Sequence, residues 1–566
     1  MRAYASELHF AAFVQAVNFA NLLLMAWALP QETIDRLKRY LDNSFGQVSA
    51  GKIDRYAVCA AVWVTLLASA LSFFIYERHP HVPDEVSYLA QAKYFAEVML
   101  TMPVPAVPDA FKVDIMTYEA NRWYSPFPPG WPAVLSLGVP LGATWLINPI
   151  LAGLNIFAVF SLMRELYDRR SARIAVLLLS ASPWYIFMAM NYMAHTFTLT
   201  CGLAAALALI RARHTDRARW AVLSGAAVGV TSLVRPLDGF ILAVLLGLWA
   251  IGVGGRRVKA SALLCFTFGS LLIGSINLLY NKALTGSFTY FPVNAYFDKY
   301  YGVGSNALGF GPGRGVGWAL DAYPGHNLFE ALINANLNIF SINIELFGWS
   351  TGALFLCAVA ILSGKLITSD RLMIVAALVV AGMYSLYWFS GGPDFGARYW
   401  YFVIIPCLAL SVSGIRLLER KLCNTYAHLS VSKDRVVTAV AILCLCSLIN
   451  YFPWRAVDKY HHYLGMRPDL RRLAVDFNFG KSLILIRGKQ YPDYASAAAY
   501  NPPDLRGNVP IFVWDRDPDI RAEVLRAYSD RPVWIVNGPS LTHSGFKVHQ
   551  GPLSAGNLLS EQAYIR

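Results

Sequence analysis

Long apolar blocks separated by polar segments dominate the chain between residues 56 and 454. Each block has about 17–25 residues, the length that crosses roughly 30 Å of hydrocarbon as a helix. The pattern predicts 11 transmembrane helices, at 56–77, 144–165, 174–191, 195–212, 220–235, 237–254, 260–281, 346–364, 372–390, 400–416 and 436–453. Residues 8–30 are also apolar, but Gln15, Asn18 and Asn21 interrupt them. They therefore fit either a twelfth span or an interfacial helix.

Basic residues crowd alternate loops of this arrangement, which gives the chain an orientation. The basic segments are 36–55, 164–173, 211–219, 256–259, 365–371 and 416–435. Loops rich in Lys and Arg stay on the cytoplasmic side, so the net charge of +13 reports topology rather than a nucleic-acid partner. The same orientation places residues 78–143, 191–195, 282–345, 391–399 and everything after about 454 outside.

The composition agrees with a polytopic α-helical membrane protein. Hydrophobic residues make up 56% of the 566 residues and charged residues 15%, with a mean hydropathy of +0.43. Soluble domains average about 45–50% apolar and about 25% charged residues. Most of this chain is therefore expected to lie in a bilayer.

The C-terminal region differs from the rest because it is charged, rich in proline and free of any predicted span. The apolar runs SLILI (482–486), VPIFVW (509–514) and PVWIV (532–536) read as short strands. Between the last two, residues 517–528 have an acidic start and helical apolar spacing. Strand–helix–strand predicts a small α/β domain with a parallel pair. Three regions follow: an N-terminal segment (1–55), a transmembrane domain (56–454) and an outer α/β domain (455–566).

An acidic pair stands where the first predicted span leaves the membrane, in the stretch PDEVSYLAQAKYF (83–95). Pro83 suits the first turn of a helix, and unpaired N–H groups there favour ionised carboxylates at Asp84 and Glu85. Tyr88, Ala92, Phe95 and Met99 fall on one stripe, which predicts a helix lying along the membrane surface. The simpler interpretation is charge compensation of the helix end.

Basic side chains from separate segments are predicted to lie near the outer boundary of the membrane. Arg122 lies in the first outer loop, and Arg235, His195 and Arg398 lie at outer ends or corners of predicted helices. Taken singly, each arginine fits a lipid-headgroup contact and His195 fits a capping or packing role. Together with one carboxylate base they suit a lipid-linked sugar phosphate, because fixed arginines neutralise a departing phosphate and a carboxylate accepts the attacking hydroxyl's proton.

Further residues near these levels complete the candidate substrate-binding set. Tyr88, Tyr124, Trp131, Tyr399 and Trp400 could stack on sugar faces or belong to the aromatic belt of any membrane protein. His326, in the second outer loop, joins this set.

Two other motifs are weaker. The glycine-rich run at 309–318 lacks GKS or GKT and follows no strand, so it predicts a closing loop rather than a nucleotide site. His461 and His462, with Asp458, have metal-binding chemistry. Adjacent histidines point apart on a regular helix or strand, however, so no metal site is predicted.

Six segments occur in the order known from one enzyme family: PDEVSYLAQAKYF (83–95), YSPFPPGWPAVL (124–135), NYMAHTFTL (191–199), LVRPLDGFIL (233–242), ELFGWS (345–350) and GARYWYFVIIPCLAL (396–410). Together they resemble the polyprenyl-phosphate-sugar-dependent GT-C glycosyltransferases, relatives of the aminoarabinose transferase and protein mannosyltransferases. The resemblance implies that Asp84, with Glu85 as neighbour or substitute, is the acceptor-activating base. It also implies that Arg398 and Arg235 contact the donor phosphate. Many members have a lysine before the paired prolines; this chain reads SPFPPG, which leaves Arg122 as the possible stand-in.

The resulting expectation is an inverting glycosyltransferase of the bacterial inner membrane, with its active site and C-terminal domain facing the periplasm. It would use a polyprenyl-phosphate sugar donor and a glycan, lipid or protein acceptor, in contact with membrane lipids and without nucleic acid. Whether a divalent cation is needed stays open. The alternatives are a flippase for a lipid-linked glycan, or a ligase that uses a polyprenyl-diphosphate oligosaccharide.

Overall fold

The computed structural model describes residues 2–45, 53–316, 325–349, 352–392, 394–425 and 434–565. Part of the predicted second outer loop (317–324) and Ser350 of the ELFGWS motif lie outside these described residues. The chain divides into two compact units. Unit 1 comprises Met1–Ala68, Asn148–Ala189 and Ala194–Arg455; unit 2 comprises Ser69–Ile147, Met190–Met193 and Ala456–Arg566.

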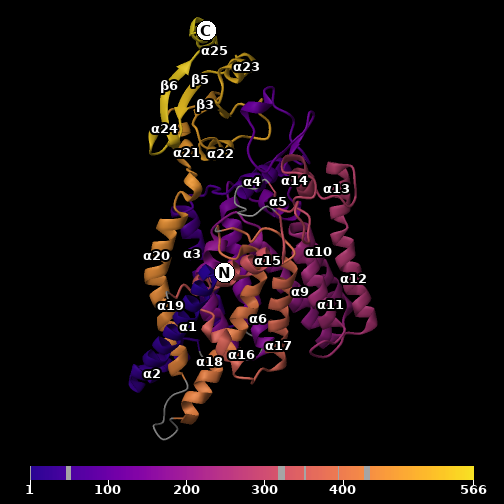
Figure 1. Cartoon of the computed structure of the whole chain (residues 1–566), viewed down its shortest axis with the longest axis vertical. Helices are drawn as coiled ribbons and strands as arrows, with labels where there is room; N and C mark the ends of the chain where they lie inside the picture. The colour runs from indigo at the N-terminus through magenta and orange to yellow at the C-terminus, as the bar shows by residue number, and fades with distance from the viewer. Residues whose placement is uncertain are drawn as a thin grey trace. The chain divides into compact units, whose positions relative to one another are not determined.

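Unit 1 is helical (Figure 1). Its elements are α1 (Arg2–Ala28), α2 (Gln31–Phe45), most of α3 (Arg55–Phe74), α6 (Ile147–Leu166), α7 (Arg169–Ser180), α8 (Pro183–Ala189), α9 (His195–Thr215), α10 (Ala218–Val234), α11 (Pro236–Ala250), α12 (Ala260–Gly274), α13 (Ile276–Thr285), α14 (Pro292–Tyr300), α15 (Leu328–Glu345), α16 (Phe355–Leu362), α17 (Thr368–Tyr384), the 3₁₀ turn η3 (Arg398–Val403), α18 (Ile404–Thr425), α19 (Arg435–Cys446) and α20 (Phe452–Arg455).

The number of long apolar helices is smaller than the sequence predicts. Among the described residues, six helices are long and apolar enough to cross a membrane, or seven if the pair α7–α8, bent by 63°, is one span. The segments predicted as spans at 220–235 and 237–254 form the shorter helices α10 and α11, because Arg235 has extended backbone and Pro236 begins the next helix. In the described part of 346–364, the helix is the short α16. The membrane-protein class is confirmed, and among the described residues six or seven of the 11 predicted spans have the length and apolar composition of a full span.

Small residues let the helices around α10 pack closely. A Cβ built on Gly225 would lie 1.9 Å from the carbonyl oxygen of Phe266 on α12, so only glycine fits there. Around this contact, Ala205, Leu209 and Val228 are buried in one apolar cluster with residues of α11 and α12. At the break between α10 and α11, a Cβ built on Gly239 would lie 2.6 Å from the backbone of Ser232, so the two helices also approach closely next to Arg235.

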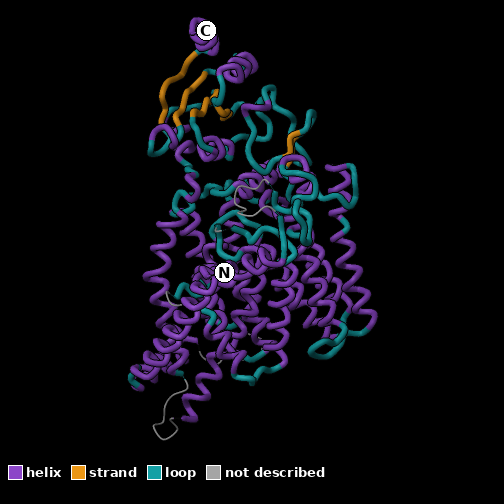
Figure 2. Tube along the Cα trace, in the orientation of Figure 1, coloured by secondary structure: helices purple, strands orange, loops and turns teal. Residues whose placement is uncertain are grey.

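Unit 2 contains a mixed four-stranded sheet, drawn as strands in Figure 2. The strand order is β4-β3-β5-β6, with β3 (Leu483–Arg487), β4 (Ile511–Trp514), β5 (Val533–Asn537) and β6 (Lys547–Leu553). β3 pairs in parallel with both β4 and β5, while β6 is antiparallel to β5. The helices are α21 (Asp469–Asp476), α22 (Tyr491–Ala498), α23 (Pro518–Ala527), α24 (Pro539–Thr542) and α25 (Ala555–Ile565). The three predicted strands and the helix at 517–528 are confirmed, although β4 and β5 flank β3 instead of pairing directly.

The first outer loop folds with this sheet. It carries α4 (Pro83–Ala96), η1 (Pro108–Ala110), β1 (Thr117–Tyr118), β2 (Trp123–Tyr124), α5 (Gly130–Ser136) and η2 (Thr144–Leu146). Val107, Phe111 and Trp123 of the loop share one buried cluster with Leu485 and Val513 of the strands. Unit 2 is therefore a composite of the loop and the C-terminal region.

Candidate functional site

Helix α4 carries the acidic pair in its first turn, and the two carboxylates have different surroundings. Glu85 is fully buried. Its Oε2 accepts hydrogen bonds from the hydroxyl of Tyr76 (2.8 Å) and the backbone N–H groups of His81 (2.8 Å) and Val82 (3.3 Å). Its Oε1 accepts from the backbone N–H of Tyr192 (2.9 Å). Four donors converging on one carboxylate favour a positioning role for Glu85.

Burial raises the pKa of Glu85 from 4.5 to about 7, although the N–H groups of His81 and Tyr192 and the Tyr76 hydroxyl oppose the shift. Between these two values the folded protein keeps a proton that the unfolded chain has lost. The free energy of unfolding therefore falls as the pH rises through this interval, by up to about 3 kcal/mol.

The substitution Glu85→Gln is expected to flatten this pH dependence. It should also lower the free energy of unfolding at every pH, because an amide lacks the second acceptor oxygen. The pH dependence is measured from thermal unfolding midpoints in detergent between about pH 4.5 and 7.5. If the variant kept the pH dependence of the wild type, Glu85 would not be its source.

Asp84, the other member of the pair, is partly exposed in the first turn of α4. The helix that carries it is held by the rest of unit 2: Val86 packs with Met466 and Ala495, and Lys93 donates to the carbonyl oxygen of Ala499 (2.6 Å). α4 ends at Ala96, short of Met99, and Tyr88 and Ala92 of the predicted apolar stripe are buried in protein. The expectation that this stripe faces the membrane surface is therefore wrong.

Arg235 lies at the break between α10 and α11 in unit 1, within a buried polar cluster. Its guanidinium forms an ion pair with Asp238 and donates to the hydroxyl of Tyr384 (2.9 Å), which in turn donates to Asp238 (2.7 Å). It also donates to Nε2 of His195, and it lies over the ring of Tyr399 with Cζ 5.0 Å from the centroid. Since arginine only donates, this contact assigns Nε2 of His195 as the acceptor.

Arg398 approaches the same aromatic ring from η3. Its Cζ lies 5.4 Å from the centroid of Tyr399, its Nε donates to the carbonyl oxygen of Gly391 (2.6 Å), and its guanidinium pairs with Asp394 (3.3 Å). The structure thus brings together three predicted residues from separate helices: Arg235, His195 and Arg398. We name these three, with Tyr384 and Tyr399, the cation cluster. Asp238 and Asp394 were not predicted, although their spacing of three and four residues from an arginine is typical of ion pairs.

An apolar cavity of about 180 Å³ lies beside the cation cluster within unit 1. Its wall includes Leu199, Leu242, Val380 and Phe402. These residues follow or precede His195, Asp238, Tyr384 and Arg398 by four positions, about one helical turn on each element. The cavity wall therefore begins about one helical turn from the polar cluster, an arrangement suited to a ligand with an anionic head and a hydrocarbon tail.

Three predicted residues of the first outer loop make local contacts in unit 2. Arg122 pairs with Glu119 (2.7 Å) and lies over the ring of Tyr124, whose hydroxyl also donates to Glu119 (2.8 Å). Trp131 is buried and donates to the backbone carbonyl of Tyr192 (2.7 Å). Arg122 and Trp131 therefore make structural contacts that the sequence did not predict.

The remaining predicted residues are also buried. Tyr88 packs against Phe127, with ring centroids 4.4 Å apart. His326 has both ring nitrogens engaged, by Glu330 (3.1 Å) and by the carbonyl oxygen of Ser385 (2.9 Å). In the same outer segment, Gly311 and His326 exchange backbone hydrogen bonds, which tie the described part of the glycine-rich run to the start of α15. This arrangement favours a positioning role for His326.

The chain is similar to several known proteins. Residues 130–280 match the model of the dolichyl-phosphate-mannose-protein mannosyltransferase family. The structure of ArnT from Cupriavidus metallidurans bound to undecaprenyl phosphate aligns with a TM-score of 0.51 at 15% identity, over 86% of this chain and 93% of that one. An oligosaccharyltransferase of Archaeoglobus fulgidus aligns with a TM-score of 0.44 at 15% identity, over 78% of this chain and 63% of that one. Arabinofuranosyltransferase AftD from mycobacteria gives a TM-score of 0.41 at 15% identity, over 87% and 36%. Among curated proteins no sequence matches.

Proposed function

Because this chain is a membrane protein with the GT-C glycosyltransferase fold, as its sequence resemblance predicted, we propose that it transfers a sugar from a polyprenyl-phosphate donor to an acceptor hydroxyl. The observation that carries this proposal is an apolar cavity whose wall begins about one helical turn from the cation cluster. The reaction would take place at the outer face of a bacterial inner membrane, where the first and second outer loops are expected to lie. The acceptor class stays open among glycan, lipid and protein.

The hydrocarbon tail and the phosphate of the donor fit the apolar cavity and the cation cluster, respectively. The isoprenoid tail would occupy the apolar cavity, where burial of hydrocarbon contributes about 25 cal/mol per Å². The phosphate would lie against the guanidinium groups of Arg235 and Arg398. Both arginines are already paired with carboxylates, Asp238 and Asp394, which hold them in place before the donor arrives. ArnT of Cupriavidus metallidurans, which shares the fold, was crystallised with undecaprenyl phosphate.

In the proposed reaction, a bond forms between the acceptor oxygen and the anomeric carbon of the sugar. The bond from that carbon to the phosphate oxygen breaks, and polyprenyl phosphate leaves with the electron pair. Asp84 accepts the proton of the attacking hydroxyl, while Glu85, held by four donors, fixes the first turn of α4. A single displacement inverts the anomeric centre.

Blocking the cavity tests the donor assignment. Ala376 on α17 lines the cavity, whereas Leu378 on the same helix is 65% exposed on the outside of unit 1. Ala376→Trp is expected to lower the affinity for added polyprenyl phosphate at least about tenfold, because the indole occupies space needed by the tail. Leu378→Trp, the matched control, should bind like the wild type. Native mass spectrometry of the detergent-solubilised protein measures the bound lipid; equal binding by both variants would contradict the assignment.

A further inference from the structure

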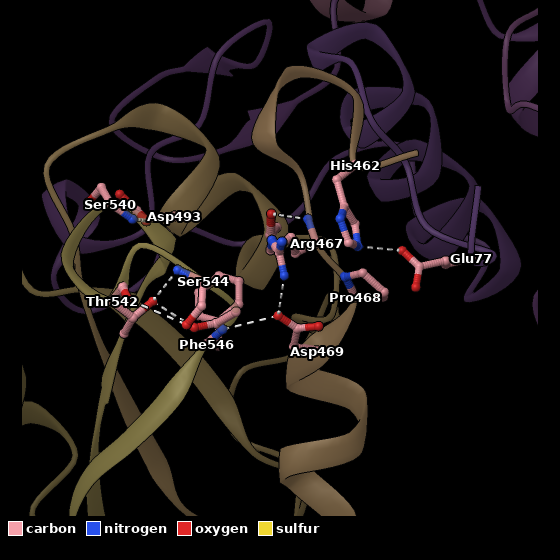
Figure 3. A network of polar contacts seen from close by, with 12 residues as sticks. Glu77, His462, Arg467, Pro468, Asp469, Asp493, Ser540, Thr542, Ser544 and Phe546 are labelled. Carbon is pink, nitrogen blue, oxygen red and sulfur yellow. Dashed lines mark hydrogen bonds and ion pairs between the residues drawn. The ribbon is translucent and has the colours of Figure 1, made fainter. Parts of the chain in front are cut away.

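Two histidines and a glutamate that the proposed reaction does not use gather in unit 2. Glu77 follows the end of α3, and His461 and His462 follow the π-helical turn that comes after α20. Glu77 Oε2 lies 3.0 Å from Nε2 of His462 (Figure 3), and the rings of His461 and His462 are 3.8 Å apart between centroids. One donor atom from each of the three residues lies within 4.8 Å of the others.

The expectation that adjacent histidines point apart is therefore wrong here, and the backbone explains why. The π-helical turn (Ala456–Tyr460) ends before both histidines, and His462 has left-handed backbone with φ of 53°. The regular helical arrangement therefore does not continue through His461 and His462, and their rings lie close together. Glu77 also has positive φ, at 52°. Non-glycine residues are uncommon in this region of backbone space and cluster at functional sites. Both residues are held in this geometry by the surrounding chain.

The segment that follows His462 is anchored, which holds the pair in place. Met466 is buried against Val86 of α4, and Arg467 pairs with Asp469 (3.6 Å). Asp469 accepts a hydrogen bond from the backbone N–H of Phe546 (3.0 Å), just before β6, as Figure 3 shows. The donors thus come from two chain segments, both fixed within unit 2.

A further imidazole is buried beside this group. His81 is fully buried and packs against Tyr76 with ring centroids 4.0 Å apart. It is close enough to His461 and His462 to interact with them electrostatically. The backbone of Tyr460 is its hydrogen-bonding neighbour.

We propose that Glu77, His461 and His462 bind a divalent transition-metal ion such as Zn²⁺, with His81 beside them. Two imidazole nitrogens and one carboxylate oxygen are a common zinc ligand set that leaves a fourth position for water or another donor. Ligand atoms around tetrahedral Zn²⁺ lie about 3.3–3.5 Å apart, so small side-chain rotations convert the observed spacing into coordination. The ion would join the chain after α3 to the chain after α20 and stabilise unit 2.

Metal uptake by the full-length protein tests the site. The protein is purified in detergent without a polyhistidine tag, stripped with EDTA, equilibrated with Zn²⁺ and desalted, and bound zinc is measured by elemental mass spectrometry. One equivalent is expected for the wild type, with at least about tenfold weaker binding for Glu77→Gln and for His462→Gln. His549→Gln, an exposed histidine on β6, is the control and should bind like the wild type. Added Co²⁺ should give the intense visible bands of a tetrahedral site, which the variants lose.

Thermal unfolding in EDTA separates a binding defect from misfolding. Each variant should match the stripped wild type in EDTA, and only the wild type and the His549→Gln control should gain stability on adding Zn²⁺. No zinc on the wild type would overturn the proposal. Equal zinc on the wild type and on the His461→Gln/His462→Gln double variant would overturn it as well, and Glu77 and His462 would then form only an ion pair.

Discussion

The Asp84→Asn variant is expected to lose transfer activity by about 10²–10⁴-fold while remaining folded and binding donor like the wild type. The amide has nearly the shape of the carboxylate but accepts no proton, so the acceptor hydroxyl reaches the anomeric carbon without a base. Transfer of a radiolabelled sugar from extracted donor lipid, with purified protein and membrane extract as the acceptor source, measures the rate. Native mass spectrometry measures donor binding in the same preparation.

Asp109→Asn provides the matched control for this variant. Asp109 belongs to the same outer loop and forms an exposed ion pair with Lys112, so its loss should change the rate little. A wild-type rate in Asp84→Asn would remove the base assignment. Equal loss of donor binding and of rate in Asp84→Asn would instead place Asp84 in donor recognition.

The second large effect is expected at Arg235. Removing the arginine alone would leave Asp238 buried without its partner, which is strongly destabilising. The double variant Arg235→Gln/Asp238→Asn removes both charges and keeps hydrogen-bonding groups, so the fold should persist. Loss of a charged hydrogen bond to phosphate is expected to weaken polyprenyl-phosphate binding about 10–100-fold.

A remote ion pair controls for the double substitution. Arg256 and Asp216 pair at 3.3 Å on an exposed loop segment of unit 1. Arg256→Gln/Asp216→Asn should leave lipid binding unchanged, because this pair touches neither the cavity nor the cation cluster. Undiminished lipid binding by Arg235→Gln/Asp238→Asn would exclude Arg235 from the phosphate site.

Local sequence patterns predicted the strands and helices that depend on residues close together in the sequence. The apolar runs at β3, β4 and β5 and the proline-started helix α4 follow from periodicity and end signals within a few residues. The break between the predicted spans at 220–235 and 237–254 is confirmed at Arg235–Pro236. The helices on either side have only 17 and 15 residues, so apolar runs alone do not give the length of each helix.

Contacts between distant residues explain what the sequence did not reveal. The carboxylate of Glu85 meets the N–H of Tyr192, 107 positions away, so its burial could not be predicted from the acidic pair alone. Tyr384 reaches Arg235 across 149 positions and has no sequence signal of its own. The ion pair of Arg235 with Asp238 could have been predicted, because the two residues are three positions apart in the sequence. The close approach of the His461 and His462 rings depends on one left-handed residue, which an argument from a regular helix cannot anticipate.

The central claim is that the chain acts on a polyprenyl-phosphate sugar. Mass spectrometry of the lipids that co-purify with the wild-type protein from its native membrane in mild detergent tests this most directly. We expect a polyprenyl monophosphate, free or carrying one sugar, whose abundance falls in Ala376→Trp. A polyprenyl diphosphate carrying an oligosaccharide in its place would exclude the proposed donor and favour a ligase or a flippase.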